Sequence, residues 1–155
     1  MSYVPEEIIS TLRMRLSGRE EREFALQLEE CLKFLYIRSI EGSGFIPLVD
    51  SVDDVWHELI LQTEFYAKLC ESLPGGNFIH HRTVAFGDHS RNIGKSEAVR
   101  DLLRWIPLYV SYFGPFREEI VDYWMIVRFV MEKFGMSLDE INELGHREGQ
   151  AVNPF

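Results

Sequence analysis

The sequence predicts an all-α protein: a single compact domain over residues 1–155, with five or six helices and one long histidine-containing loop. Three observations lead to this prediction. Apolar residues recur at helical spacing along most of the chain. Glycines and prolines interrupt that spacing at intervals that suit helix ends. No stretch shows the convincing alternation of apolar and polar residues that is typical of a half-buried strand.

The first half of the chain predicts three helices. Pro5 begins the first, because proline is favoured at an early helical position, and Ser17-Gly18 ends it. The second covers about 19–38, with a glutamate-rich first turn that suits the helix dipole. The third begins at Asp50 or Ser51 and continues without interruption to the stop at Pro74. A projection of this helix gathers its core positions on one face: Val52, Val55, Leu59, Thr63, Tyr66 and Cys70, with Trp56 on the flank.

The second half predicts a loop and three more helices. The loop covers residues 77–94, a length that is uncommon inside a domain and often functional. The fourth helix begins near Ser96 and is kinked or split by Pro107. The fifth covers about 116–134, and the last covers 137–144 and is capped by Gly145. The tail, residues 146–155, is expected to be loose or to dock through Val152 and Phe155.

Composition limits the class of protein. The net charge is −9, and the one basic run, from Arg13 to Arg22, also contains acids, so we expect a solvated face and no nucleic-acid partner. No stretch approaches the ~20 apolar residues of a membrane span, and the first ten residues do not resemble a signal peptide. We therefore expect a cytoplasmic protein without a membrane partner, in which Cys31 and Cys70 are reduced, buried thiols.

Four of the five histidines lie between positions 57 and 89. His57 falls at the border of the third helix's core face, one turn after Asp53, which can fix the tautomer of the imidazole and leave one nitrogen free to bind. His80 and His81 follow in the loop, where neighbours in an extended segment point to opposite sides, so we expect only one of them to face the helix. His89 is a further candidate.

A histidine from a helix, one or two from a following loop, and a carboxylate form a ligand set that zinc or iron sites use. The sequence therefore predicts a metal site with His57 and one or both of His80 and His81 as ligands, although the spacing matches no established metal motif. Two alternatives stay open. The cluster is structural, with Thr63, Tyr66 and His57 holding the loop backbone, or it forms a ligand or partner pocket without metal. The alternative function is a non-catalytic protein-interaction or accessory module in which the histidine motif is structural, and whether the chain is an enzyme stays open.

The residues from Val52 to His81 resemble the glycine-rich domain-containing protein-like family. The resemblance covers about thirty residues, and it implies that one motif is formed by Asp53, Trp56, His57, Thr63, Tyr66, Cys70, His80 and His81. The chain departs from the family pattern at Leu59, where many members carry a second histidine, and at Arg82-Thr83, where members often carry a proline. The glycine-rich region that names the family is absent from this sequence. The family is largely uncharacterised, so the resemblance implies little chemistry.

Overall fold

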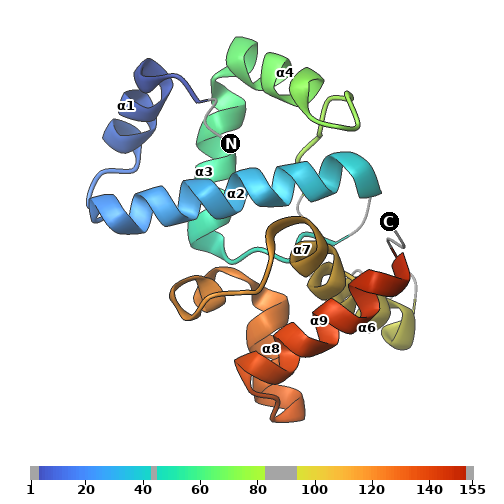
Figure 1. The fold of residues 1–155 in the computed structure, drawn as a ribbon. Coiled ribbons are helices and arrows are strands. Elements are labelled where there is room, and N and C mark those ends of the chain that lie inside the picture. Colours follow the sequence, from blue (N-terminus) through green and yellow to red (C-terminus); the bar gives the residue numbers. More distant parts are fainter. Residues whose placement is uncertain (1–3, 43–44, 83–93, 153–155) are drawn as a thin grey trace. The chain divides into compact units, whose positions relative to one another are not determined.

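The computed structural model describes residues 4–42, 45–82 and 94–152 (Figure 1). About 75% of the described residues are helical and none of them forms a strand, which confirms the all-α class. They contain eight α-helices, where the sequence predicts five or six, because two of the expected helices are each divided in two. None of these helices combines the length and the apolar character that crossing a membrane would require.

The chain divides into two compact units, so the prediction of a single domain stays a prediction. The first unit contains Met1–Ile40 and Asp50–Ile79, and the second contains Glu41–Val49 and His80–Phe155. Of the predicted loop, residues 77–82 are described and carry no helix, whereas residues 83–93, which include His89, lie outside the described residues.

The first unit consists of α1 (Glu6–Arg15), nearly all of α2 (Glu21–Glu41), α3 (Asp50–Leu61) and α4 (Thr63–Ser72). The long helix α2 crosses α3 (Figure 1), and the Phe34 ring meets the Trp56 ring edge-on, with centroids 4.9 Å apart. The core of this unit is apolar and includes both free cysteines: Leu12, Phe24, Leu28, Cys31, Phe34, Leu35, Ile37, Val52, Val55, Trp56, Leu59, Tyr66, Leu69 and Cys70.

The basic run from Arg13 to Arg22 lies against carboxylates, which fits the predicted solvated face. Arg15 forms an ion pair with Glu58. Arg19 donates to the carboxylate of Asp54 at 3.0 Å and to the backbone carbonyl of Ser51 at 2.7 Å, so it ties the start of α2 to the start of α3. Both guanidinium groups are thus paired with acids of the same unit.

The prediction of one uninterrupted third helix is wrong, because the chain breaks at Gln62. Gln62 has φ −83° and ψ 62°, which lies outside the helical region. Its N–H bonds to the Leu59 carbonyl, three residues back, instead of to the carbonyl four residues back. The break changes the phase of the helical face, so Thr63 is exposed although the projection places it in the core. Trp56, expected on the flank, is fully buried.

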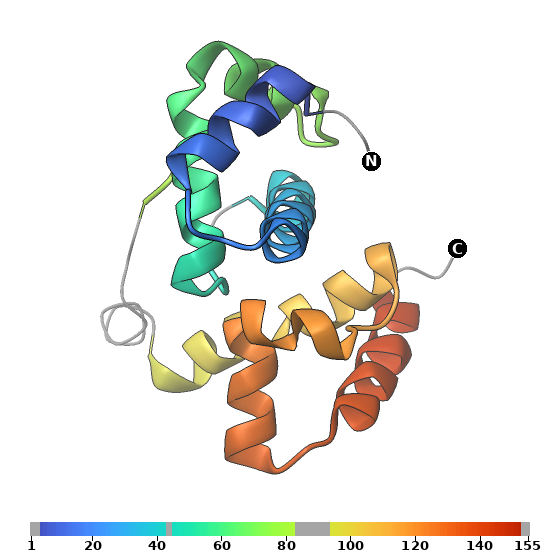
Figure 2. The ribbon, with the colours of Figure 1, turned by 90° about the vertical axis from the view of Figure 1, so that its left-hand side faces the viewer.

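The second unit contains α6 (Lys95–Leu103), α7 (Trp105–Phe113), the 3₁₀ helix η1 (Glu118–Tyr123), α8 (Met125–Phe134) and α9 (Leu138–Val152). The predicted split at Pro107 is confirmed: α6 ends at Leu103, whose carbonyl would bond to residue 107 in a continuous helix, and proline has no N–H to donate. Figure 2 shows a connection without helix that joins α8 to α9. Gly135 ends α8 in the left-handed conformation.

The predicted fifth helix is wrong over its first half. Residues 118–123 form η1, and Trp124 is extended, with φ −113° and ψ 107°. Trp124 forms an isolated antiparallel bridge with Leu48, and the neighbouring Met125 N–H donates to the carbonyl of Pro47 at 2.9 Å. These bonds to residues 47–49 replace helical bonds around a tryptophan that is fully buried. A pairing between segments so distant in sequence leaves no local signal.

The predicted cap at Gly145 is also wrong, because α9 continues to Val152. The backbone N–H of Glu140 donates to Ser137 Oγ at 3.2 Å, which is a capping bond at the predicted start of the helix, so that start is confirmed. Gly145 is buried against α7. A Cβ atom there would lie 2.7 Å from Val110 Cγ2 and 3.1 Å from Ile106 Cγ2. The glycine is therefore a close-packing position inside the helix. Of the tail, residues 153–155 lie outside the described residues.

We expect Gly145→Ala to destabilise the protein by about 1–3 kcal/mol, because its methyl group would overlap Val110, a side chain with a stiff χ1 angle. A loss of stability would be informative, because at an exposed helix position the change from glycine to alanine stabilises the helix by about 1 kcal/mol. The free energy of unfolding from urea titration measures this effect. Glu148→Ala, at an exposed position of the same helix, is the control and should change stability by less than about 0.5 kcal/mol. A stabilising Gly145→Ala would contradict the close packing.

Candidate metal centre

Asp53 and His57 form the helical half of the candidate site. They lie one turn apart on α3, and His57 Nε2 is 3.5 Å from Asp53 Oδ2. The His57 side chain is 48% exposed and the Asp53 side chain is 20% exposed, so the pair lies at the edge of the unit. This is the border position that the helical projection predicts. The carboxylate and the imidazole both lie at the edge of the unit, outside its apolar core.

A buried pair of hydrogen bonds connects α3, α4 and the loop. Trp56 Nε1 donates to the Tyr66 hydroxyl at 3.0 Å, and this hydroxyl donates to the backbone carbonyl of Ile79 at 2.6 Å. In a continuous helix, residues ten positions apart are separated by about 15 Å along the axis. The bond between Trp56 and Tyr66 therefore requires the break at Gln62.

The segment before Ile79 is held against the first unit by packing as well. Gly75 lies so close to α2 that a Cβ atom would be 1.8 Å from the Ser39 carbonyl oxygen, so no other residue fits there without a backbone shift. The Phe78 ring meets the Tyr66 ring edge-on, with centroids 5.2 Å apart. Ile79 is only 7% exposed. The loop thus leaves the unit from a fixed point at Ile79.

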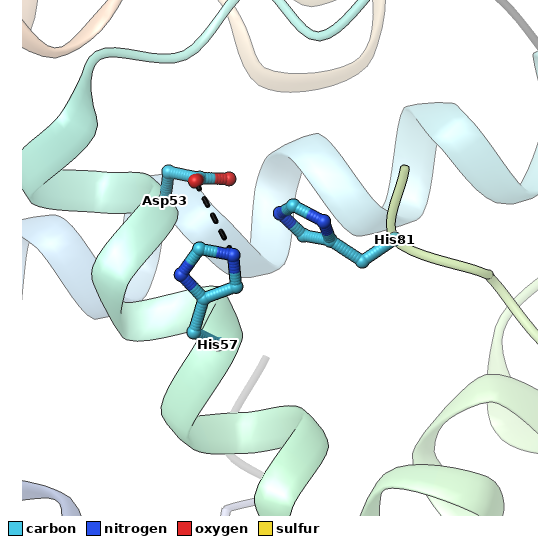
Figure 3. Close-up of side chains that lie close together, drawn as sticks. All are labelled: Asp53, His57 and His81. Carbon is cyan, nitrogen blue, oxygen red and sulfur yellow. Dashed lines mark ion pairs between the residues drawn. The ribbon is translucent and has the colours of Figure 1, made fainter. Parts of the chain in front are cut away.

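His81 completes the cluster. It is two residues after Ile79, where the first unit ends, and it is half-buried, whereas His80 is exposed. The ligand atoms of Asp53, His57 and His81 all lie within 4.8 Å of one another. Figure 3 shows the two imidazoles and the carboxylate gathered around a common point, two from α3 and one from the loop. Among the described residues, this is the cluster of metal-ligating side chains that the geometry supports.

The separations are close to those of a bound ion. Nitrogen and oxygen ligands lie about 2.0–2.2 Å from zinc, so two ligands of a tetrahedral site are about 3.3–3.6 Å apart. The 3.5 Å between His57 and Asp53 matches this spacing. No ligand separation exceeds 4.8 Å, so closing around an ion needs shifts of about 1 Å, which rotation of exposed and half-buried side chains can supply.

The other predicted site residues lie outside the cluster of Asp53, His57 and His81, or beyond the described residues. His80 is not part of the cluster, and Thr63 is exposed after the break in the helix. Trp56, Tyr66 and Cys70 are fully buried, so they support the site from within the core. His89 lies outside the described residues. The backbone carbonyl of Ile79 was missed, because a main-chain acceptor leaves no residue-type signal in a sequence.

Two ionisable side chains in the core beneath the site, Cys31 and Tyr66, favour their uncharged forms. Burial raises the pKa of the Cys31 thiol well above its usual range, and the nearby Asp53 carboxylate raises it further. Burial likewise raises the pKa of the Tyr66 hydroxyl, so it stays a neutral donor. Both cysteines are free and buried, which confirms the prediction of unpaired, buried thiols. Cys70 lies in the core, whereas His57 lies at the surface.

We expect Tyr66→Phe to lower the free energy of unfolding by about 1–3 kcal/mol, because the Trp56 N–H and the Ile79 carbonyl would both be left buried without this partner. His57→Ala should change it by less than about 0.5 kcal/mol, because the His57 side chain is 48% exposed. Urea titration with a chelator present measures both. The opposite ranking would mean that the surface histidine, and not the buried tyrosine, holds the loop.

We also expect the difference in stability between the wild type and Cys31→Ala to change at alkaline pH in favour of the variant. The Cys31 pKa is raised in the folded state, so the unfolded chain loses its thiol proton first, near pH ~8.5. The neutral Cys31 thiol therefore does not lower the free energy of unfolding of the wild type below that pH. Above it, the free energy of unfolding of the wild type falls relative to that of Cys31→Ala, by up to about 1.4 kcal/mol per pH unit. Urea titrations with a chelator, from about pH 7.5 to 10, measure this. A difference that does not depend on pH would contradict the buried neutral thiol.

The chain was also compared with known proteins. No family model, curated protein or solved structure matches it. The resemblance to the glycine-rich domain-containing protein-like family therefore stays a prediction. The features of this chain that bear on function are a carboxylate and two imidazoles whose ligand atoms lie within 4.8 Å of one another, presented by a helix and by a loop anchored at Ile79.

Proposed function

We propose that the protein binds one divalent transition-metal ion through Asp53, His57 and His81. The observation that carries the proposal is the approach of their three ligand atoms to within 4.8 Å of one another. Two of these residues are one turn apart on a helix, and the third comes from an anchored loop. Exposed acidic groups often cluster without a metal, but two imidazoles beside one carboxylate, on separate elements, form a more selective set of donors.

Zinc or ferrous iron suits this ligand set best. Two histidines and one carboxylate form the protein part of catalytic zinc sites and of the facial triad of non-haem iron proteins. Three protein ligands leave at least one coordination position for water or a small molecule. Because the His57 side chain is 48% exposed, that position would be accessible from solvent. The site would therefore be an open one, and a closed structural site would need a fourth protein ligand.

Metal content and affinity test the proposal. Protein purified without a histidine tag and dialysed against Zn²⁺ or, without oxygen, Fe²⁺ should retain about one equivalent by elemental analysis. His57→Ala, His81→Ala and Asp53→Asn should each weaken binding by at least about tenfold, since each removes one of three ligands. Retention below about 0.2 equivalents of either metal would rule the proposal out.

His80→Ala is the matched control, because His80 is the exposed neighbour of His81 and is not in the cluster. We expect its metal affinity to equal that of the wild type. His146→Ala, which removes an exposed histidine of α9, controls for adventitious binding by surface imidazoles. An equal loss of affinity in all four histidine variants would point to scattered surface binding.

The second candidate function is a non-catalytic interaction or accessory module, in which the motif is structural. One observation favours it: the bonds from Trp56 to Tyr66 and from Tyr66 to Ile79 hold the loop without any metal. A protein partner and a cytoplasmic location remain part of this proposal, in keeping with a net charge of −9 and two free thiols. This function would be favoured if the wild type retains no metal but binds one protein partner, and if His57→Ala or His81→Ala abolishes that binding.

A further inference from the structure

Tyr66 is fully buried near the proposed site but is not one of the three metal ligands, so its role there needs a separate explanation. Tyr66 touches none of the three ligands by any hydrogen bond described above. Its hydroxyl instead accepts the Trp56 N–H and donates to the Ile79 carbonyl, at 3.0 and 2.6 Å. A hydroxyl that is both donor and acceptor is the one feature by which tyrosine differs from phenylalanine at this position.

We infer that Tyr66 is a positioning residue of the proposed metal site, which acts by holding Ile79 and so determines where His81 stands. The inference rests on the proposed function. It assigns to the hydroxyl a role in metal affinity in addition to its role in stability. Residues that orient metal ligands without touching the metal commonly change affinity by about 10–100-fold when they are substituted.

The short distance along the chain makes this coupling strong. Only His80 separates Ile79 from His81, and two residues span at most about 7 Å even when fully extended. Fixing the Ile79 carbonyl therefore confines His81 to a small volume. Without this anchor the nearest preceding helical residue is Ser72, nine positions before His81, and the loop would have to be ordered when the metal binds.

The anchor also selects which histidine is used. In an extended segment, successive side chains point to opposite sides. Ile79 is buried, the next residue His80 is exposed, and His81 turns back towards Asp53 and His57. This alternation depends on the register at Ile79, which the Tyr66 hydroxyl holds. A loop that moved by one residue would present His80 in place of His81.

The Tyr66→Phe protein should still fold, because the apolar contacts of the ring remain. The Phe78 ring contacts the Tyr66 ring, and Ile79 stays in an apolar environment. Removal of the hydroxyl is therefore expected to loosen the Ile79 carbonyl without removing the core side chain. Tyr109→Phe is the matched control, because Tyr109 is also fully buried and aromatic but lies on α7, in the other unit.

The first measurement is the dissociation constant for Zn²⁺ alone, from competition with a chromophoric chelator, for wild type, Tyr66→Phe and Tyr109→Phe. Circular dichroism should first show that each variant is folded under the conditions used. We expect Tyr66→Phe to bind about 10–100-fold more weakly and Tyr109→Phe to bind as the wild type does. Equal affinity in Tyr66→Phe and wild type would overturn the inference and leave the metal site intact. Absence of binding in the wild type would overturn both.

A double-mutant cycle separates positioning from a general structural effect. Asp53 and His57 still form a two-ligand chelate in His81→Ala, whose weaker affinity can be measured at higher metal concentration. If Tyr66 acts through His81, adding Tyr66→Phe to His81→Ala causes no further loss, whereas in the wild-type background it causes the full loss. Equal losses in both backgrounds would mean that Tyr66 only supports the fold, and would overturn the inference.

A glycine inserted between His80 and His81 provides a test that does not alter Tyr66. The insertion leaves the bond to Ile79 intact but lengthens the connection and reverses the alternation. We expect its affinity to fall to that of His81→Ala, with the stability of the wild type retained. Wild-type affinity in this variant would show that His81 finds the metal without the anchor, which would also overturn the inference.

Discussion

The first unit depends on one buried hydroxyl. Tyr66 connects the indole of Trp56 on α3 with the backbone of the loop at Ile79, and it can do so only because the chain breaks at Gln62 and folds α4 back. A hydroxyl buried in an apolar core is costly unless it is paired, and this one both accepts and donates. One interaction thus joins a helix, its neighbour and the start of the loop.

The division of roles among the motif residues follows from this bond. The residues that face inward, among them Trp56, Tyr66 and Cys70, are uncharged and fully buried, and they determine the path of the chain. The residues that face outward, Asp53, His57 and His81, carry the donor atoms. A motif that looks like one site in the sequence therefore consists of two sets of residues. The buried set determines the path of the chain, and the set at the surface carries the atoms that can bind a metal ion.

The sequence predicts the helical class well because helical periodicity and helix ends are local properties. The split before Pro107 and the start of the last helix at Ser137 could both be predicted from the sequence, because a missing N–H and a capping hydroxyl act within one helical turn. The break at Gln62, the extended Trp124 and the buried Gly145 were not. Each depends on a partner far away in the sequence: Ile79, Leu48 and Val110, respectively.

For the site, the pairing of Asp53 with His57 and the use of only one loop histidine were predictable from helix and strand geometry. Which loop histidine faces the helix was not, because the register depends on a hydrogen bond to a main-chain carbonyl. Metal binding at this site is most directly tested by a crystal structure of metal-loaded protein with anomalous diffraction at the zinc or iron edge. We expect one strong peak within bonding distance of Asp53, His57 and His81. A loaded crystal whose only anomalous peak lies elsewhere, or which shows none, would contradict it.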